Sequence, residues 1–224
     1  MINKIAQILC ELISIESISE NSNLDIIAYI EKILASSGVS ARCVLSSDGR
    51  KASLLATIGP ADRPGLVLSA HTDVVPVEGQ AWTMPPFAGV IRDQRIYGRG
   101  ATDMKGFLAV VLANVPRLKE VASVAPVHLA FSYDEEVGCR GAPDLVRVLM
   151  QSVAPPALAI VGDGEKTAIA VALRAEVLPL VASSAVRPPI WRQLPLSDAP
   201  QAHRILEANE NIGKVLLLPA GATS

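Results

Sequence analysis

The sequence has few aromatic residues and no excess of charge of either sign. Of its 224 residues, 4% are aromatic, and 20 basic residues nearly balance 22 acidic ones, for a formal net charge of −2. This balance produces no electrostatic field suited to nucleic acid or to an anionic membrane surface. Nucleic-acid and membrane partners are therefore not expected.

Cysteine is also scarce. Cys10, Cys43 and Cys139 are an odd number at wide spacings, and they include no Cys-x-x-Cys pair that would indicate a zinc ribbon or thiol redox chemistry. Reduced thiols are predicted. The sequence has no uncharged run of transmembrane length and no apolar segment behind a basic N-terminal region, and a cytoplasmic protein is expected.

Half of the residues are hydrophobic, and the pattern alternates between helix and strand. After two helices, apolar strand-like runs alternate with helical ones, which predicts a three-layer α/β sandwich with a mostly parallel sheet. Helices are expected over residues 1–12, 22–38, 104–115 and 142–150, and strands over 53–58, 66–70, 127–133 and 158–161. A capping box of Ser22 and Asp25 is predicted to start the second helix. The passage 76–100 is expected to be a long functional connection.

The character of the sequence changes after Gly164. A helix is expected over 165–181, a proline-punctuated connection over 183–196, a second helix over 197–209 and a strand over 212–218. The predicted domains are therefore residues 1–163 and a helix-helix-strand tail over 164–224.

Acidic and imidazole side chains gather at the ends of predicted strands. His71 and Asp73 follow the run Gly65-Leu66-Val67-Leu68, Asp103 stands before a predicted helix, and Glu135-Glu136 follows another strand. Parallel strands deliver such residues to one edge of a sheet. Imidazole and carboxylate are ordinary ligands of divalent zinc, and a carboxylate is able to bridge two ions. Each residue also has a simpler interpretation, as a turn aspartate, a surface histidine or a solvated acidic pair, and spacing alone leaves the two interpretations about even.

Within the metal interpretation, the pattern predicts different roles for these residues. His71 and Glu136 are predicted ligands, and Asp103 is the predicted bridge. Asp73, two residues after His71, lies on the same side of an extended chain, where it is able to accept the second imidazole N–H. Glu135 is the predicted general base that takes a proton from the attacking water.

Two long motifs resemble the M20 metallopeptidase family. The first runs from Ser69-Ala70-His71-Thr72-Asp73 through Trp82 and Pro86-Phe87 to Gly98-Arg99-Gly100 and Asp103-Met104-Lys105; the second is Tyr133-Asp134-Glu135-Glu136-Val137-Gly138. Over residues 1–163 the chain is most similar to the acetylornithine deacetylase branch. The resemblance implies the same roles for His71, Asp103, Glu135 and Glu136, and two Zn²⁺ ions, with Co²⁺ as an alternative. It places a further metal ligand at Asp163, which is equally placed to be a loop residue after a strand.

The remainder departs from that family. The lid and dimerisation domain and the late histidine ligand of M20 enzymes are not recognisable, and residues 165–221 resemble the C-terminal end of a zinc-type quinone oxidoreductase of the medium-chain dehydrogenase superfamily. No G-x-G-x-x-G fingerprint follows a strand, so NADPH binding is not expected.

Two functional hypotheses follow from the sequence. The first is a metal-dependent amidohydrolase of N-acetylornithine or a related small N-acyl amino acid, with activity impaired because one ligand, the lid and most of the family's homodimer surface are missing. The second is a non-catalytic fusion remnant with at most partial metal binding.

Overall fold

The computed structural model describes residues 2–162, 190–195 and 214–218. The chain divides into two compact units, residues 1–174 and 175–224. The described elements, in chain order, are α1 (Ile2–Ser14), α2 (Leu24–Ser36), β1 (Ala41–Leu45), β2 (Ala52–Ile58), β3 (Leu66–His71), β4 (Val90–Arg92), β5 (Arg95–Tyr97), α3 (Lys105–Val121), β6 (Val127–Ser132), α4 (Ala142–Ser152), β7 (Leu158–Val161), β8 (Ile190–Pro195) and β9 (Lys214–Leu218).

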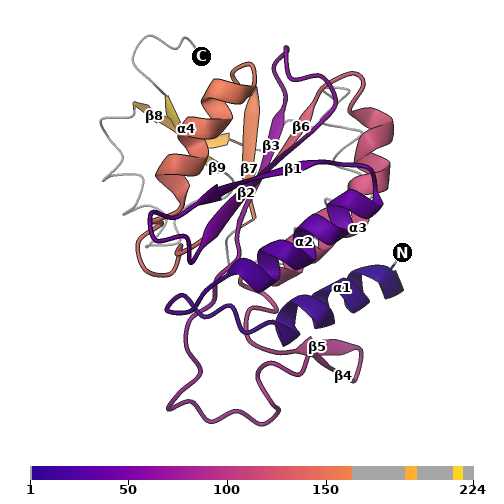
Figure 1. Ribbon diagram of the computed structural model, residues 1–224, viewed down its shortest axis with the longest axis vertical. Helices are drawn as coiled ribbons and strands as arrows, with labels where there is room; N and C mark the ends of the chain where they lie inside the picture. Colours follow the sequence, from indigo (N-terminus) through magenta and orange to yellow (C-terminus); the bar gives the residue numbers. More distant parts are fainter. Residues whose placement is uncertain (1, 163–189, 196–213, 219–224) are drawn as a thin grey trace. The chain divides into compact units, whose positions relative to one another are not determined.

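The first unit is an α/β sandwich built on a five-stranded sheet with the strand order β1-β2-β6-β3-β7 (Figure 1). β3 pairs in parallel with β6 and with β7, whereas β2 is antiparallel to both β1 and β6. The expected α/β sandwich is confirmed, with a mixed sheet in place of a mostly parallel one. A short turn joins β1 to β2, and a short connection between adjacent strands reverses their direction.

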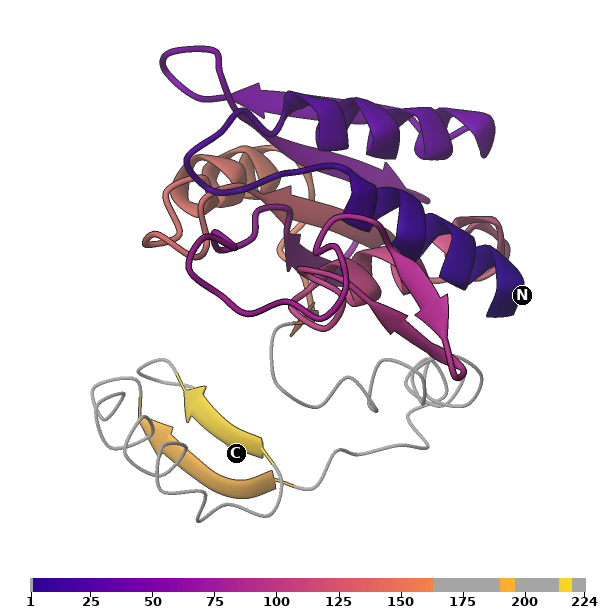
Figure 2. The ribbon, with the colours of Figure 1, turned by 90° about the horizontal axis from the view of Figure 1, so that it is seen from below.

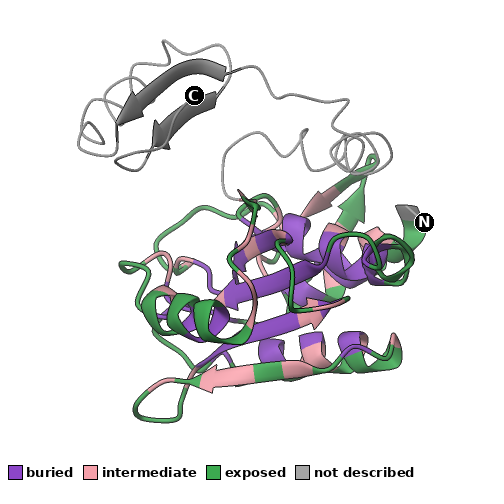
Figure 3. Ribbon diagram, turned by 90° about the horizontal axis from the view of Figure 1, so that it is seen from above, coloured by how far each residue is buried: buried purple, intermediate pink, exposed green. Residues whose placement is uncertain are grey.

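Helices cover both faces of this sheet. On one face α4 packs against an apolar cluster that consists of Leu55, Val67, Ala130, Leu145, Val148 and Leu149. α2 and α3 lie on the opposite face, and α1 packs on α3 (Figure 1). The central strands are almost entirely buried, whereas the outer surface of α4 is exposed (Figure 3). Burial of the apolar sheet between two helical layers supplies the main driving force for folding.

The long passage after β3 contains a small hairpin that the sequence did not predict. β4 and β5 pair antiparallel, and the residues between them, Asp93 and Gln94, have φ values of 50° and 60°. Figures 1 and 2 show this hairpin beside α1. The loop that precedes β4 comes so close to α1 at Gly89 that only glycine fits, because a Cβ there would lie 2.8 Å from the Cα of Cys10.

Several other boundaries differ from the sequence prediction. β1 was not predicted, and α3 continues through Pro116 to Val121. The N-cap of α2 is Asn23, not Ser22, and the Asn23 side chain does not cap the helix, because its amide bonds both backbone groups of Ala52. The hydroxyl of Ser22 instead accepts the backbone N–H of Leu24 at 3.2 Å.

The second unit contains the parallel pair β8 and β9. The predicted strand near residue 214 is confirmed, whereas residues 190–195, predicted as part of a connection, form β8. The two predicted tail helices lie outside the described residues, and the predicted domain boundary after residue 163 stays a prediction.

Candidate metal centre

The candidate metal centre forms where β3 and β6 end. These strands are parallel neighbours, and His71 pairs in register with Ser132 at their carboxyl ends. His71 is therefore delivered directly to the sheet edge at which the chain leaves β6 towards Glu135 and Glu136. Acidic and imidazole groups from distant parts of the sequence meet here because parallel strands end at a common edge.

His71 is the buried centre of this group. Its side chain is 2% exposed, and its Nε2 atom lies 3.0 Å from Oδ1 of Asp103 and 3.9 Å from Oε2 of Glu135. Ligand atoms of His71, Glu135 and Glu136 all lie within 4.8 Å of one another. An imidazole and carboxylates at such distances are a donor set that suits a divalent transition-metal ion.

Asp73 connects the two halves of the site. Its Oδ1 accepts the backbone N–H of Glu135 at 3.1 Å, and its Oδ2 accepts the backbone N–H of Glu136 at 3.3 Å. Nδ1 of His71 lies 2.9 Å from the backbone carbonyl oxygen of Asp73 and 3.5 Å from its Oδ1. The carboxylate that the sequence assigned to the imidazole thus also fixes the backbone that carries both glutamates.

The turn after β6 aims the glutamates at His71. Asp134 has a φ of 56°, a left-handed conformation that aspartate adopts more readily than most residues. Its buried carboxylate forms an ion pair with Lys51. This pairing fixes the sharp bend that brings the following two residues back onto Asp73.

Neighbouring charges set the protonation of the site. Burial alone would lower the pKa of His71, but the carboxylates of Asp73 and Asp103 outweigh it and raise that pKa to about 9. Burial and the charge of Asp103 raise the pKa of Glu136. A proton and a cation compete for the same acidic cluster, as expected for groups that bind metal.

The loop that joins α1 to α2 supports this site, which the sequence did not predict. Ser19 donates its hydroxyl to Oδ2 of Asp73 at 2.7 Å, and the Ser17 hydroxyl donates to the Thr72 carbonyl at 2.6 Å. A backbone bridge pairs Ile18 with Val74. The only hint in the sequence is the alternation of serines about Ile18, which places both hydroxyls on one side of an extended chain.

Comparison with known proteins identifies the family. Residues 67–210 match peptidase family M20/M25/M40. The chain belongs to this family. The match overlaps the segment in which the sequence resembled a quinone oxidoreductase, and that second resemblance stays a prediction.

Relatives of this M20 chain include acetylornithine deacetylases. The enzyme of Pasteurella multocida is 33% identical over 151 residues, which are 67% of this chain and 38% of the relative. That of Shigella sonnei is 31% identical over 150 residues, covering 66% of this chain and 38% of the relative. The chain therefore spans less than half the length of these relatives.

Solved structures share the fold of this chain. The M20 metallo-carboxypeptidase of Sulfolobus solfataricus superposes with a TM-score of 0.61 at 25% identity, over 70% of this chain and 36% of that one. Human carnosine dipeptidase 1 gives a TM-score of 0.60 at 22% identity, over 72% and 38%.

Five of the six predicted site residues meet in the structure. His71, Asp73, Asp103, Glu135 and Glu136 form one cluster, whereas Asp163 lies outside the described residues. Their individual roles are considered below.

Proposed function

We propose that this M20 chain hydrolyses the amide bond of small N-acyl amino acids, with divalent ions bound at the candidate metal centre. The observation that carries the proposal is the buried imidazole of His71 facing three carboxylates at one sheet edge. N-acetylornithine is the first substrate to test, because relatives of the chain are named acetylornithine deacetylases.

The residues present fit a zinc ion. His71, Asp103 and Glu136 would hold it, with Asp163 as a further proposed ligand and Co²⁺ as an alternative ion. A bound divalent ion would supply Lewis acidity that polarises the substrate carbonyl and makes water a stronger nucleophile near neutral pH.

Glu135 is proposed to move the proton. Its carboxylate is one-third exposed and lies on the same side of the site as Nε2 of His71, at 3.9 Å. In that position it would accept a proton from the attacking water and deliver it to the leaving amine. The bond between the carbonyl carbon and the amide nitrogen then breaks, which yields a carboxylate and a free amine.

Asp73 would act through other residues. It orients the imidazole through Nδ1 and holds the two glutamates by their backbone N–H groups. Such preorganisation matters because misplacing a reacting group by about 1 Å is able to cost on the order of 100-fold in rate.

The proposal is tested by measuring acetate release from N-acetyl-L-ornithine with the zinc-loaded full chain. We expect Glu135→Gln to lower kcat by at least about 100-fold, because general acid-base catalysis is typically worth ~10²–10⁴. Glu120→Gln is a matched control, since Glu120 is exposed near the far end of α3. That variant should keep full activity.

Metal analysis of the same samples separates the two functional hypotheses. Hydrolysis that depends on Glu135 supports the enzyme. Zinc binding that needs His71, with no hydrolysis of N-acetylornithine or of other N-acyl amino acids, would instead favour a non-catalytic metal-binding protein.

A further inference from the structure

A pocket of about 320 Å³ lies in the segment that leads to the metal centre. Thr102 lines this pocket and directly precedes Asp103, the proposed bridging ligand. The pocket therefore extends to the residue beside that proposed ligand. None of the roles assigned above uses this pocket.

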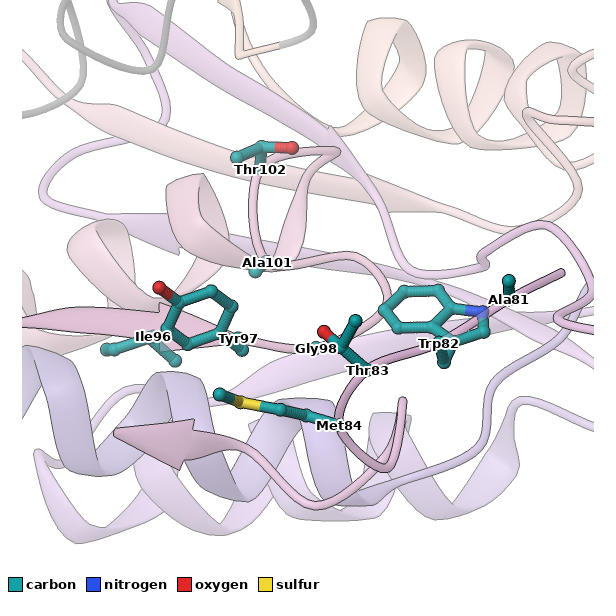
Figure 4. A pocket seen from close by; sticks show the side chains of 9 residues that line it. All are labelled: Ala81, Trp82, Thr83, Met84, Ile96, Tyr97, Gly98, Ala101 and Thr102. Carbon is teal, nitrogen blue, oxygen red and sulfur yellow. The ribbon is translucent and has the colours of Figure 1, made fainter. Parts of the chain in front are cut away.

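Its walls come from two parts of the long passage after β3. Trp82 and Met84 belong to the loop before the hairpin, and Ile96 and Tyr97 belong to β5. Figure 4 shows the rings of Trp82 and Tyr97 at opposite ends, with Thr83 and Gly98 between them in this view. The lining thus contains two aromatic rings and a thioether.

Hydrogen bonds and stacking hold the Trp82 wall in place. The guanidinium carbon of Arg99 lies 5.0 Å from the centre of the Trp82 ring, and the indole N–H donates to Gln80 at 3.2 Å. Arg99 also donates to Gln80, and its backbone N–H donates to the carbonyl of Pro86 at 2.7 Å. A cation stacked on an indole and tied to the same loop keeps the pocket formed before a ligand binds.

The lining itself contains no charged side chain. None of the nine described residues that line the pocket is acidic or basic, and the polar side-chain groups are the hydroxyls of Thr83, Tyr97 and Thr102. A charged group held among these nine residues would meet hydroxyls and apolar surface instead of an opposite charge within the lining itself. The volume is at the small end of the ~300–1,000 Å³ typical of ligand pockets, and it exceeds what an acetyl group requires.

We propose that this pocket binds an uncharged, ring-sized or branched apolar group attached to the scissile amide. This inference rests on the proposed function and narrows its substrate class to N-acyl amino acids that carry such a group. The group stands either on the amine side of the amide, as an amino-acid side chain, or on the acyl side.

Binding is tested through Trp82 fluorescence in the full zinc-loaded chain that carries Trp191→Phe, which leaves Trp82 as the single tryptophan of the sequence. Adding Glu135→Gln prevents turnover during the titration. The probes are N-acetyl-L-phenylalanine, apolar on the amine side; N-benzoylglycine, apolar on the acyl side; and N-acetyl-L-ornithine, which is cationic. We expect one of the two apolar probes to bind at least tenfold more tightly than N-acetyl-L-ornithine.

Two ring-adding variants identify the pocket. Thr83→Phe places a ring at an exposed lining position and should weaken binding of the preferred probe by at least tenfold. Ile91→Phe adds the same ring at a 60% exposed position outside the lining and should leave binding unchanged. Equal effects of the two variants would overturn the assignment.

Turnover of the three probes by the chain with Glu135 intact separates this inference from the proposed function. Equal kcat/KM for all three, with no saturable change in Trp82 fluorescence, overturns the pocket assignment and leaves amide hydrolysis standing. Saturable binding of an apolar probe that Thr83→Phe weakens, without hydrolysis of any probe, supports the pocket and overturns the hydrolysis.

Discussion

The proton on His71 links the acid-base chemistry of the site to metal binding. Asp73 and Asp103 raise its pKa to about 9 against the opposing effect of burial, so the imidazole carries a proton at neutral pH when no metal is bound. A metal ligand must be a neutral imidazole. Zinc binding therefore has to displace this proton.

We predict that the apparent zinc affinity rises with pH between about pH 6 and 8. Displacement of one proton gives a slope of about tenfold per pH unit while the pH is below the pKa of His71. Asp73→Asn removes a charge that raises this pKa and should flatten the slope in the upper part of that range. Titration against chelator-buffered zinc measures both slopes.

Asp62→Asn is the control for that titration, because Asp62 is exposed and paired with Arg63 at the surface. It should keep the wild-type slope. Identical slopes for wild type and Asp73→Asn would contradict control of the His71 proton by Asp73.

Residue type and strand position were enough to predict most of the cluster. His71, Asp73, Glu135 and Glu136 follow strands that apolar runs made visible in the sequence, and the structure brings them together with Asp103. Ser19 could not be predicted, because its contact with Asp73 depends on how a loop is folded back across the end of β3. Local sequence patterns indicate whether a segment is a helix or a strand, but they do not indicate which distant loop packs across it.

At the scale of elements, the passage between β3 and α3 contains glycines with left-handed backbone conformations but different surroundings. Gly79 and Gly89 both have positive φ, at 73° and 57°. A Cβ at Gly79 would meet nothing within 4 Å, whereas one at Gly89 would meet the backbone of Cys10 in α1.

We predict that Gly79→Ala lowers the free energy of unfolding by about 1–2 kcal/mol, the usual cost of a left-handed conformation with a Cβ. Gly89→Ala should cost clearly more, because α1 must also move away from the loop. Urea unfolding of both variants measures the difference. Equal losses would show that α1 does not constrain the loop at Gly89.

Elements with continuous apolar runs were predictable whatever their exposure, and elements of mixed sequence were not. β3 and β7 were predicted almost to the residue, whereas β1 is an edge strand that is nowhere fully buried, and its sequence shows no clear alternation. The β4–β5 hairpin turns at Asp93-Gln94 instead of the Asn-Gly or Asp-Gly that signals such turns. The helix expected over 104–115 continues through Pro116 to Val121, because the tertiary packing of α3 outweighs the local preference of proline.

At the scale of the whole first unit, a buried histidine makes stability depend on pH. His128 in β6 is 0% exposed; Thr57 Oγ1 lies 3.0 Å from its Nδ1, and within the described part of the chain its buried Nε2 has no partner. Burial lowers the pKa of His128 below its ordinary 6.5. His128 therefore binds a proton less readily in the folded state than in the unfolded state.

We predict that the unfolding free energy falls as the pH drops below about 6.5, by up to ~1.4 kcal/mol per pH unit, because the unfolded state then binds more protons. Above that pH the contribution of His128 is constant. His128→Asn should show a shallower loss between pH 6.5 and 5.5. His71 does not contribute to that difference, because it is present in both proteins and its effect on the pH dependence cancels between them.

Within the residues described, no helix is long and apolar enough to cross a bilayer.

The mixed sheet was less predictable than its strands, because strand direction depends on which neighbours pair and not on any one strand's composition. β2 sits antiparallel between β1 and β6 although its own sequence is as apolar as that of β3.

The parallel pairing of β3 with β6 also determines when the metal centre can exist during folding. His71 and the two glutamates are far apart in sequence, with the hairpin and all of α3 between them. Contacts between distant residues form late, since the entropy of closing a long loop must be overcome first. Zinc bound by His71 together with Glu136 would therefore mark chains in which β3 and β6 have already paired. The metal would stabilise a sheet that has already formed and would not nucleate its folding.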